Sequence, residues 1–591
     1  MSDHQIQKNY DFIKKLPEWA KTFAVKYCSN TASTYIFHGN IRDFLAQRTA
    51  ENKFKFVEIQ DYIGDVLFGY KGRIACFDRS SGISFVENPA GIEKDANKND
   101  YIVTMSQLLG SKPENRKDLF TRNLTKAFSL MEQYFYKKIE ENERIVFIID
   151  FAETIIPISN TQNYSDEDRF SLVTIKRWAY NPIFIHKDVT VILLTENLSE
   201  LNQNLLRCPG IIKINVPIPD ETTRYDFIEY KKGTGRLLLD ESLTTSTVAT
   251  ITGGLNLLNI NQIAAESFQE KKRISLEYLR KKKKELIENE SAGLLEFIET
   301  ESTLEMVSGH DYVKSTLKKA ANNIKQGSFD VLPMGYLISG PIGTGKTFLV
   351  TSFTGEIGIP VVRMLNFRSK YVGATESNIE KILNILKAMA PVAVMIDEAD
   401  AVLGDRNQDG DSGTSNRVFA QIASFMGNTE YRGKIIWFLI TCRPDLIPVD
   451  IKRQGRCEEH FSLFYPASSK ERSELFFVML KKLKIKTNVV YSDEYFKKNK
   501  FTVSGADIEA ILVRSKFIAA SEGSDVVEEE HIIEALNNFI PAVYPHEVEL
   551  QNLVSVLECT HKAMIPERYQ SIPKEKIVEQ VRHIKMMLGE R

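Results

Sequence analysis

The sequence predicts an α/β protein in which one pattern of strands and helices occurs twice. Apolar runs of strand length at 144–153 and 189–197 end in acidic or polar residues, and a similar pair follows at 391–400 and 434–445. Continuous apolar runs are typical of parallel strands that helices cover on both faces, and the carboxyl ends of such strands carry functional groups. We therefore expect two modules, each a parallel sheet flanked by helices.

The segments that follow these strands also agree between the two halves. Residues 202–220 (NQNLLRCPGIIKINVPIPD) are similar to residues 449–467, and residues 252–267 (TGGLNLLNINQIAAES) are similar to residues 503–516. Because the matches occur in the same order, they indicate a diverged internal duplication.

The composition narrows the class of protein. A chain of 591 residues is too long for one hydrophobic core, and 43% hydrophobic with 26% charged residues is ordinary for a globular protein. A net charge of −2 gives no general attraction to nucleic acid or to anionic membranes. The apolar runs are shorter than the roughly 20 residues of a membrane helix, and the N-terminus lacks the apolar region of a secretory signal. Six cysteines without metal-ligand spacing favour a reducing, cytoplasmic compartment.

A basic helix is expected between the halves. Residues 266–290 lack Gly and Pro and contain the cluster Arg280–Lys284. Such a cluster is either a nucleic-acid patch or the solvated face of a linker helix whose glutamates pair with the lysines. We favour the solvated linker helix.

The most specific motif is GPIGTGKT at 340–347, a complete G-x-x-x-x-G-K-[ST] P-loop between an apolar strand and a helical run. Its glycines permit backbone angles that turn amide groups toward phosphates, and the following helix adds the positive end of its dipole. We expect Lys346 to reach the β- and γ-phosphates of ATP and the Thr347 hydroxyl to bind Mg²⁺. The predicted nucleotide-binding residues in this segment are Gly340, Pro341, Ile342, Gly343, Thr344, Gly345, Lys346, Thr347 and Phe348.

Asp397 and Glu398 begin a DEAD tetrapeptide that also names a family of RNA helicases. We expect Asp397 to position Mg²⁺ and Glu398 to orient and polarise the attacking water. Helicases of that family place this box further from the P-loop and follow it with Ser-Ala-Thr, and no such tripeptide follows here. The tetrapeptide therefore does not indicate a helicase.

The residues after the acidic pair indicate a different family. The stretch TCRPDLIPVDIKRQGRCEEH at 441–460 resembles the second region of homology of AAA ATPases of the classical clade, in the AAA+ superfamily, where the pattern is close to TNRPDxLDxALxRxGRxD. The resemblance covers about residues 301–545. It implies P-loop NTPase-like AAA modules, each with a small helical lid, that hydrolyse ATP to ADP and phosphate. It also implies a ring, with a hexamer as the family norm.

Two further segments take roles from this resemblance. SKYVGATESNIEKI at 369–382 is similar to the pore loop, in which Tyr371 and Val372 would grip a polypeptide and Gly373 would end the turn. Arg453 and Arg456 match the arginine fingers, which neutralise charge on the phosphoryl group transferred in a neighbouring subunit.

The resemblance also extends the nucleotide site. SGAD at 504–507 is similar to the small-domain signature, so Gly505 and Ala506 would close over the adenine. Ser308 and Gly309 fill the place where the family often has Gly-Gly before a helix, and Ser308 is included in the predicted site. The first sensor departs from the pattern, because Cys442 replaces the usual Asn and a thiol is a poor hydrogen-bond donor. Either Thr441 takes over this role, or hydrolysis is slow.

The first half lacks these motifs. Residues 31–225 contain no P-loop, Phe151 stands where an acid should follow Asp150, and only Arg207 remains in the finger region. We interpret this module as degenerate and unable to hydrolyse ATP, an arrangement similar to plastid and cyanobacterial tandem AAA proteins with an inactive first half. HGNIRDF at 38–44 is interpreted as an ordinary polar turn.

The predicted domains follow from these assignments. They are an N-terminal helical segment at 1–30, a degenerate AAA-like α/β domain at 31–225, its helical lid at 226–270, a basic linker helix at 271–300, an active AAA α/β domain at 301–465, its helical lid at 466–545, and a C-terminal helical segment at 546–591.

The sequence thus predicts a AAA ring motor that uses ATP and Mg²⁺ to remodel, unfold or disassemble a protein client by pulling it past the pore loops. The expected partners are other copies of the chain and a protein client of unknown identity, with no membrane span. The alternatives are a nucleic-acid-dependent ATPase that uses the basic helix and a slow-turnover scaffold that binds ATP in order to assemble. The sequence contains no H-E-x-x-H protease motif, so degradation would need a separate partner.

Overall fold

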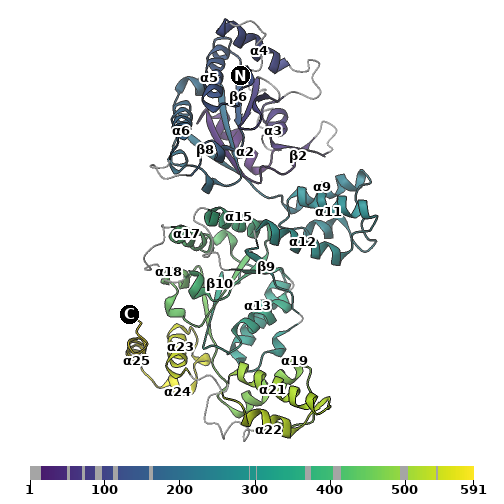
Figure 1. Ribbon diagram of the computed structural model, residues 1–591, viewed down its shortest axis with the longest axis vertical. Helices are drawn as coiled ribbons and strands as arrows, with labels where there is room; N and C mark the ends of the chain where they lie inside the picture. The colour runs from purple at the N-terminus through teal and green to yellow at the C-terminus, as the bar shows by residue number, and fades with distance from the viewer. Residues whose placement is uncertain are drawn as a thin grey trace. The chain divides into compact units, whose positions relative to one another are not determined.

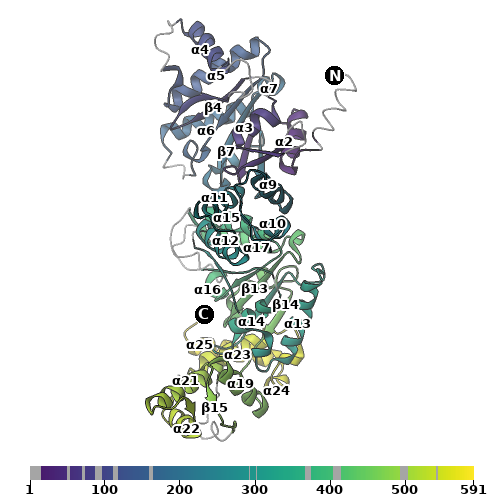
Figure 2. The same cartoon turned by 90° about the vertical axis from the view of Figure 1, so that its right-hand side faces the viewer.

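The computed structural model describes most of the chain (Figures 1 and 2). The described residues are 13, 15–48, 54–69, 73–86, 96–110, 118–158, 164–291, 293–300, 302–357, 359–365, 374–403, 414–492, 504–540 and 544–590. They form two compact units, Met1–Ile287 with Glu376–Ala388 and Glu288–Thr375 with Met389–Arg591.

The first unit is built on a six-stranded sheet in the order β5-β4-β6-β7-β1-β8 (Figure 1). Neighbouring strands are parallel except β5, which runs antiparallel to β4. Every residue of β6 and β7 is buried, which confirms the two parallel strands predicted in this half. The strands are β1 (Thr34–Gly39), β4 (Arg73–Asp78), β5 (Gly82–Phe85), β6 (Ile145–Ile149), β7 (Val189–Thr195) and β8 (Ile211–Val216), with a separate hairpin of β2 (Leu45–Arg48) and β3 (Phe54–Val57).

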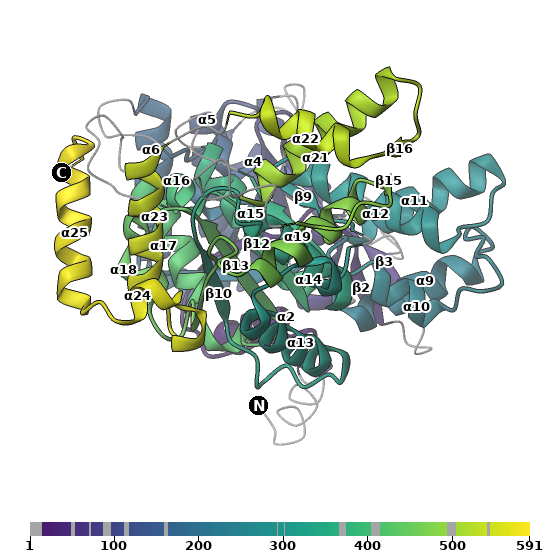
Figure 3. The same ribbon diagram turned by 90° about the horizontal axis from the view of Figure 1, so that it is seen from below.

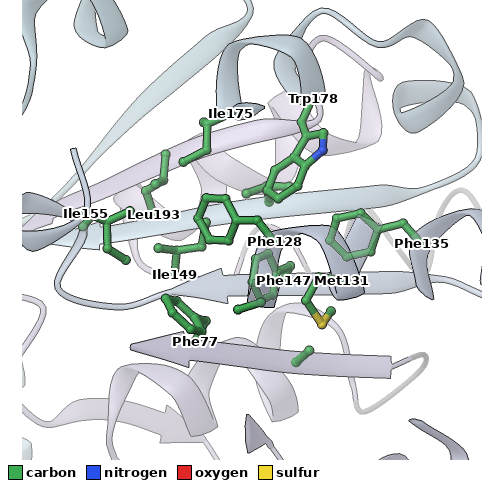
Figure 4. Packing of buried hydrophobic residues seen from close by; sticks show 14 of the residues in the cluster. Phe77, Phe128, Met131, Phe135, Phe147, Ile149, Ile155, Ile175, Trp178 and Leu193 are labelled. Atoms are coloured by element: carbon green, nitrogen blue, oxygen red, sulfur yellow. The ribbon is translucent and has the colours of Figure 1, made fainter. Parts of the chain in front are cut away.

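Helices cover both faces of this sheet, because successive side chains of a strand point to opposite faces. In β6, Phe147 and Ile149 pack on one face with Phe128 and Trp178 (Figure 4), whereas the intervening Ile148 belongs to a second core. The helices around the sheet are α2 (Glu18–Cys28), α3 (Ile59–Tyr62), α4 (Ala96–Leu109), α5 (Leu124–Glu140), α6 (Asp166–Ala179), α7 (Pro182–His186) and α8 (Gln203–Leu206).

A group of helices follows the sheet along the chain. It contains α9 (Glu221–Gly233), α10 (Thr245–Ile251), α11 (Leu257–Glu270) and α12 (Leu276–Glu290). The basic cluster Arg280–Lys284 lies on α12, but its Lys283 is buried and its Lys282 pairs with Glu266 at 2.9 Å. The cluster therefore does not form one continuous exposed basic face.

The second unit contains a sheet of the same design, in the order β14-β10-β13-β12-β11-β9. Its strands are also parallel except for one edge strand, β9, which runs antiparallel to β11. The five parallel strands thus have the same order in the two sheets, in agreement with the predicted duplication and α/β class. The antiparallel edge strand lies at the same edge but differs in its place along the chain, because β5 follows its neighbour β4 whereas β9 precedes the rest of its sheet. The strands are β9 (Leu295–Phe297), β10 (Gly335–Ser339), β11 (Val361–Met364), β12 (Val392–Ile396), β13 (Ile435–Thr441) and β14 (Glu459–Ser462).

Helices of the second half form three groups. Those that flank the sheet or lie next to its strands in the chain are α13 (Asp311–Lys325), α14 (Lys346–Ile357), α15 (Ala374–Met389), α16 (Ala399–Leu403), α17 (Thr414–Met426) and α18 (Val449–Lys452). A helical group with its own core contains α19 (Ser469–Lys482), α21 (Gly505–Ser521), α22 (Glu529–Asn537) and the short strands β15 (Lys486–Thr487) and β16 (Val526–Val527). The C-terminal segment contains α23 (Pro545–Glu558), α24 (Glu567–Gln570) and α25 (Lys574–Met587), which lie beside one another in Figure 3.

Within the described ranges, every helix is too short or too polar to cross a membrane.

Candidate nucleotide site

The predicted P-loop connects the end of β10 to the first residue of α14, as the motif requires. Gly340, Gly343 and Gly345 have φ of +148°, +81° and +83°, backbone angles that other residues rarely adopt. A Cβ atom on Gly340 would overlap the carbonyl oxygen of Leu463. The loop therefore also lies too close to the backbone after β14 for any side chain at this position. The loop therefore ends against the first free amide groups of α14, where an anion is favoured.

Lys346 is buried within this loop. Its Nζ donates hydrogen bonds of 2.8 Å to the carbonyl oxygens of Gly340 and Pro341, and it lies 3.2 Å from Sγ of Cys442. The ammonium group is thus held at the loop by backbone oxygens and by the residue that follows β13.

Thr347 and Asp397 come together from α14 and the end of β12. The Thr347 hydroxyl donates to Oδ2 of Asp397 over 3.0 Å, and Oδ1 of Asp397 accepts the Glu398 amide at 3.0 Å. Hydroxyl and carboxylate oxygens are hard ligands, and Mg²⁺ in phosphate sites takes one or two protein ligands besides phosphate and water. These two residues fit that requirement.

Glu398 is exposed and has a φ of +49°, which places it in the left-handed region. A residue other than glycine persists in this conformation only where the surrounding structure imposes it, and such residues concentrate at functional sites. Here the hydrogen bond between the Glu398 amide and the Asp397 carboxylate holds the turn.

The two sensor candidates face different partners. The Thr441 hydroxyl donates to Oδ1 of Asp400 at 2.6 Å and accepts the Arg443 amide at 2.8 Å. Cys442, in contrast, contacts Lys346. Of the two residues, Cys442 is the one that the structure brings to the P-loop, while the Thr441 hydroxyl binds Asp400 of α16.

The predicted arginine fingers lie beyond the end of α18. The Arg453 side chain is 59% exposed, with its Nε 4.0 Å from Asp450, and Arg456 donates to the Asp450 carbonyl oxygen at 2.6 Å. Burial lowers the pKa of Arg456, and the charge of Arg453 adds to this effect. Both side chains contact Asp450 of α18, and among the described residues neither forms a hydrogen bond or ion pair with the P-loop of the same chain. The pore-loop residues Tyr371, Val372 and Gly373 lie outside the described residues.

A pocket of about 1220 Å³ lies beside the P-loop in the second unit. The N-terminus of α21 forms part of its wall, and the Gly505 amide donates to the carbonyl oxygen of Gly343 at 3.2 Å. The structure thus brings the predicted adenine-side residues to the P-loop. The pocket residues that the sequence predicted are Ser308, Gly343, Thr344, Gly345, Phe348, Gly505 and Ala506.

The pocket also contains residues that the sequence analysis missed. Residues 563–568 and Gln570 of the C-terminal segment line it together with the segment 306–313. In the sequence, this part of the chain shows only an amphipathic helical pattern without a motif, so nothing in it indicated a place in the site.

The first unit contains the same turn after its corresponding strand, β6. Phe151 has a φ of +48°, and its amide donates to Oδ1 of Asp150 at 2.8 Å. In place of a P-loop, the turn after β1 brings Arg42 to Asp150, with N–O distances of 2.7 and 2.9 Å, and its guanidinium lies 3.9 Å from the Phe151 ring centre. Gln60 also donates to Asp150 at 3.0 Å.

The next residue of that turn binds the helical group. The buried Asp43 carboxylate accepts the amides of Leu257 and Leu258, at 2.8 and 2.9 Å, at the N-terminus of α11. Burial raises the pKa of Asp43, although these hydrogen bonds act in the opposite direction. The prediction of an ordinary polar turn at 38–44 is therefore wrong. Asp43 of this stretch binds the N-terminus of α11, and Arg42 binds Asp150 at the end of β6.

A P-loop that connects a strand to a helix, with an acid at the end of a strand in the same sheet, defines a P-loop nucleotide-binding protein. The family models agree with this class. Residues 336–465 match the AAA family (ATPase family associated with various cellular activities), residues 7–217 match a AAA+ chaperone N-terminal Rossmann-like domain, and residues 222–292 match a AAA+ chaperone second helical domain. The last match includes α12.

Several curated proteins are similar to the chain. An uncharacterized AAA domain-containing protein, ycf46 of Guillardia theta, is 26% identical over 380 residues, which cover 63% of this chain and 71% of the relative. The cell division cycle protein 48 homolog of Archaeoglobus fulgidus is 24% identical over 424 residues, or 66% and 56% of the two chains. The ATP-dependent zinc metalloprotease FtsH 1 of Salinibacter ruber is 29% identical over 210 residues, or 35% and 30%. The chain belongs to the AAA ATPases.

Proposed function

We propose that this AAA ATPase is a ring-forming motor in which the second unit hydrolyses ATP and the first unit does not. The observation that carries the proposal is the arrangement of Thr347, Asp397 and Glu398 beside an intact P-loop. A hydroxyl and two carboxylates come together there from α14 and the end of β12. The match to the AAA ATPase family indicates that the reaction is ATP hydrolysis.

Each residue has a role in this proposal. Lys346 binds the β- and γ-phosphate oxygens of ATP. Thr347 and Asp397 would hold Mg²⁺, which would supply positive charge against these phosphates. Glu398 orients a water molecule and takes its proton as the water oxygen bonds to the γ-phosphorus. The bond between that phosphorus and the β,γ-bridging oxygen breaks, and ADP leaves. Arg453 and Arg456 stabilise the developing charge in the site of the next subunit.

The first unit lacks the groups for this reaction. Arg42 already neutralises Asp150, so that carboxylate is not available to hold a metal ion, and Phe151 stands in place of the acid. We propose that this unit supports assembly or recruits the client. The scattered cysteines support a reducing, cytoplasmic location.

Remodelling of a protein client follows from the pore-loop resemblance at 369–373 and is supported by the chaperone descriptions of the two N-terminal family models. The test begins with the variant Glu398→Gln, which should trap ATP and the client in the ring so that the client can be identified. The variant Tyr371→Ala should then keep ATP turnover and lose client processing, whereas Tyr225→Ala, at an exposed position on α9, serves as the matched control. Normal client processing by Tyr371→Ala would remove the basis for remodelling.

A slow-turnover scaffold is the second candidate, because a thiol instead of an amide lies 3.2 Å from Lys346. In this case wild-type turnover would be almost as low as that of Glu398→Gln, and Cys442→Asn would raise it. A nucleic-acid-dependent ATPase has less support, since the basic cluster on α12 is partly buried and partly ion-paired. This function predicts that DNA or RNA stimulates ATP hydrolysis and that the stimulation weakens steeply as the salt concentration rises.

A further inference from the structure

The C-terminal segment, residues 544–590, is anchored to the edge of the second sheet. Helix α23 packs against β14, and the Ser462 hydroxyl donates to the Ser555 carbonyl oxygen at 2.8 Å in the buried interface. A hydrophobic core joins this segment to the strand end. Its buried members are Phe464, Leu550, Leu553, Val554, Val556, Tyr569, Ile577, Val581 and Ile584.

From this position α23 reaches the tip of the P-loop. Oε1 of Gln551 accepts the amide of Ile342 at 3.0 Å, and the Tyr465 hydroxyl donates to the carbonyl oxygen of the same residue at 2.7 Å. The adjacent Pro341 carbonyl binds Lys346, and the next carbonyl, of Gly343, binds the amide of α21. Gln551 thus fixes the backbone between the lysine and the helical lid.

The end of α25 reaches the turn after β13. Arg443 donates to Glu590 at 2.8 and 2.6 Å, and Lys585 lies 2.7 Å from Asp445, which also pairs with Arg443 at 3.0 Å. Burial raises the pKa of Asp445, but the hydrogen bonds from Arg443 and Lys585 outweigh it and lower the pKa overall. This network holds the residue next to Cys442, whose sulfur contacts Lys346.

Two more contacts reach the helix before the fingers and the wall of the pocket. Glu558 pairs with Lys452, the last residue of α18 and the one before Arg453. His561 stacks on Tyr312 with 4.0 Å between ring centroids, and the chain then runs along the pocket wall. The C-terminal segment therefore contacts the P-loop, the sensor turn, the helix before the fingers and the pocket.

We propose that the C-terminal segment is part of the nucleotide site and positions it for ATP, with Gln551 as the positioning residue of the P-loop. The proposal rests on the proposed nucleotide site in the second unit. A hydrogen bond that holds the P-loop acts on ground state and transition state alike, so its loss raises KM and leaves kcat largely unchanged.

The test is steady-state ATP hydrolysis by the full chain carrying Gln551→Leu, which keeps the size of the side chain and removes the acceptor. The expected KM for ATP is about fivefold higher, the effect of one hydrogen bond, with kcat within about twofold. Gln580→Leu, an exposed position on α25, is the matched control and should leave both constants unchanged. In a double-mutant cycle with Tyr465→Phe the effects on KM should not be independent, because the two side chains bind the amide and the carbonyl oxygen of the same residue, Ile342.

Glu590→Gln provides a second variant outside the buried core, in case Gln551→Leu does not fold. It should reduce kcat about threefold, because Arg443 loses one of its two carboxylate partners beside the sensor residue. Wild-type kinetics in folded Gln551→Leu, or in Glu590→Gln where the former does not fold, would overturn the proposal. If the wild-type chain itself does not hydrolyse ATP, the proposed function fails instead, and Lys346→Ala gives the background rate that defines this outcome.

Discussion

The carboxyl ends of β6 and β12 have the same backbone and different chemistry. Phe151 and Glu398 have φ of +48° and +49°, and each donates its amide to the carboxylate of the preceding aspartate, at 2.8 and 3.0 Å. The same turn thus occurs in both units, while an acid follows the aspartate only in the second unit. A conserved backbone conformation does not by itself indicate a working site.

The partner of each aspartate differs as well. Asp397 faces the Thr347 hydroxyl, which leaves its charge available for a metal ion, whereas Asp150 faces the guanidinium of Arg42. In the first unit the cation is a side chain of the protein itself. An internal ion pair of this kind stabilises the strand end without a nucleotide.

The lids are joined to the sheets in correspondingly different ways. In the second unit the Gly505 amide of α21 contacts the P-loop, and Ser504 caps that helix. In the first unit Asp43 supplies a carboxylate to the N-terminus of α11, where an anion is favoured. The first unit therefore has a carboxylate of its own sheet domain at the start of α11, where the second unit has the contact between α21 and the P-loop.

The largest expected effect separates the two turns directly. Glu398→Gln should lower kcat for ATP hydrolysis by about two to three orders of magnitude, the contribution of a general base. Phe151→Gln, the same change at the equivalent position, should leave kcat within about twofold, as measured by phosphate release. A comparable loss from Phe151→Gln would mean that the first unit takes part in the chemistry.

The second expected effect concerns the ion pair of the first unit. Arg42→Leu leaves Asp150, whose side chain is 8% exposed, without its cation, and should destabilise this unit by about 2 kcal/mol. The measurement is amide hydrogen exchange at β1 and β6. Arg169→Leu removes a surface pair with Asp166 and should change stability by less than about 0.5 kcal/mol. Unchanged exchange in Arg42→Leu would contradict a stabilising role.

Asp43→Ala should have a smaller effect, about 1 kcal/mol, because it removes a cap from α11. The amides at the start of α11 should exchange faster, and those of α21 should not change. Asp43→Asn keeps one acceptor oxygen and is the matched control. Equal exchange at α11 in wild type and Asp43→Ala would show that the helical group is held by other contacts.

The smallest effect is a pH dependence of the C-terminal segment. Burial lowers the pKa of His460, but the hydrogen bond and charge of Glu558 outweigh it and raise the pKa above 6.5. The protonated form is therefore favoured in the folded state, so its contribution is complete below pH 6.5 and is lost as the pH rises through the raised pKa. Exchange at α23 should become faster on going from pH 6 to pH 9 after correction for the intrinsic rate. The corresponding decrease in the free energy of opening should be less than about 1 kcal/mol. His460→Gln should abolish this change, and a pH dependence that persists in the variant would assign it to another group.

Much of the fold and the P-loop could be predicted from sequence, because both depend on local patterns. Continuous apolar runs predict buried parallel strands, and the glycines and lysine of residues 340–347 specify a loop between a strand and a helix. The contact of Arg42 with Asp150 could not be predicted, since the two residues are far apart in sequence and belong to no motif. The contact of Gln551 with the P-loop could not be predicted either. An amphipathic pattern indicates which face of a helix is buried, but it does not indicate which part of the protein packs against that face.

The most direct test of one active module per chain is the stoichiometry of ATP binding. Equilibrium dialysis of Glu398→Gln with ATP and Mg²⁺ should give one nucleotide per chain at saturation, and Lys346→Ala should abolish this binding. Two nucleotides per chain, or one that persists in Lys346→Ala, would place a nucleotide in the first unit and contradict the assignment of Arg42 and Asp43 as its internal substitutes.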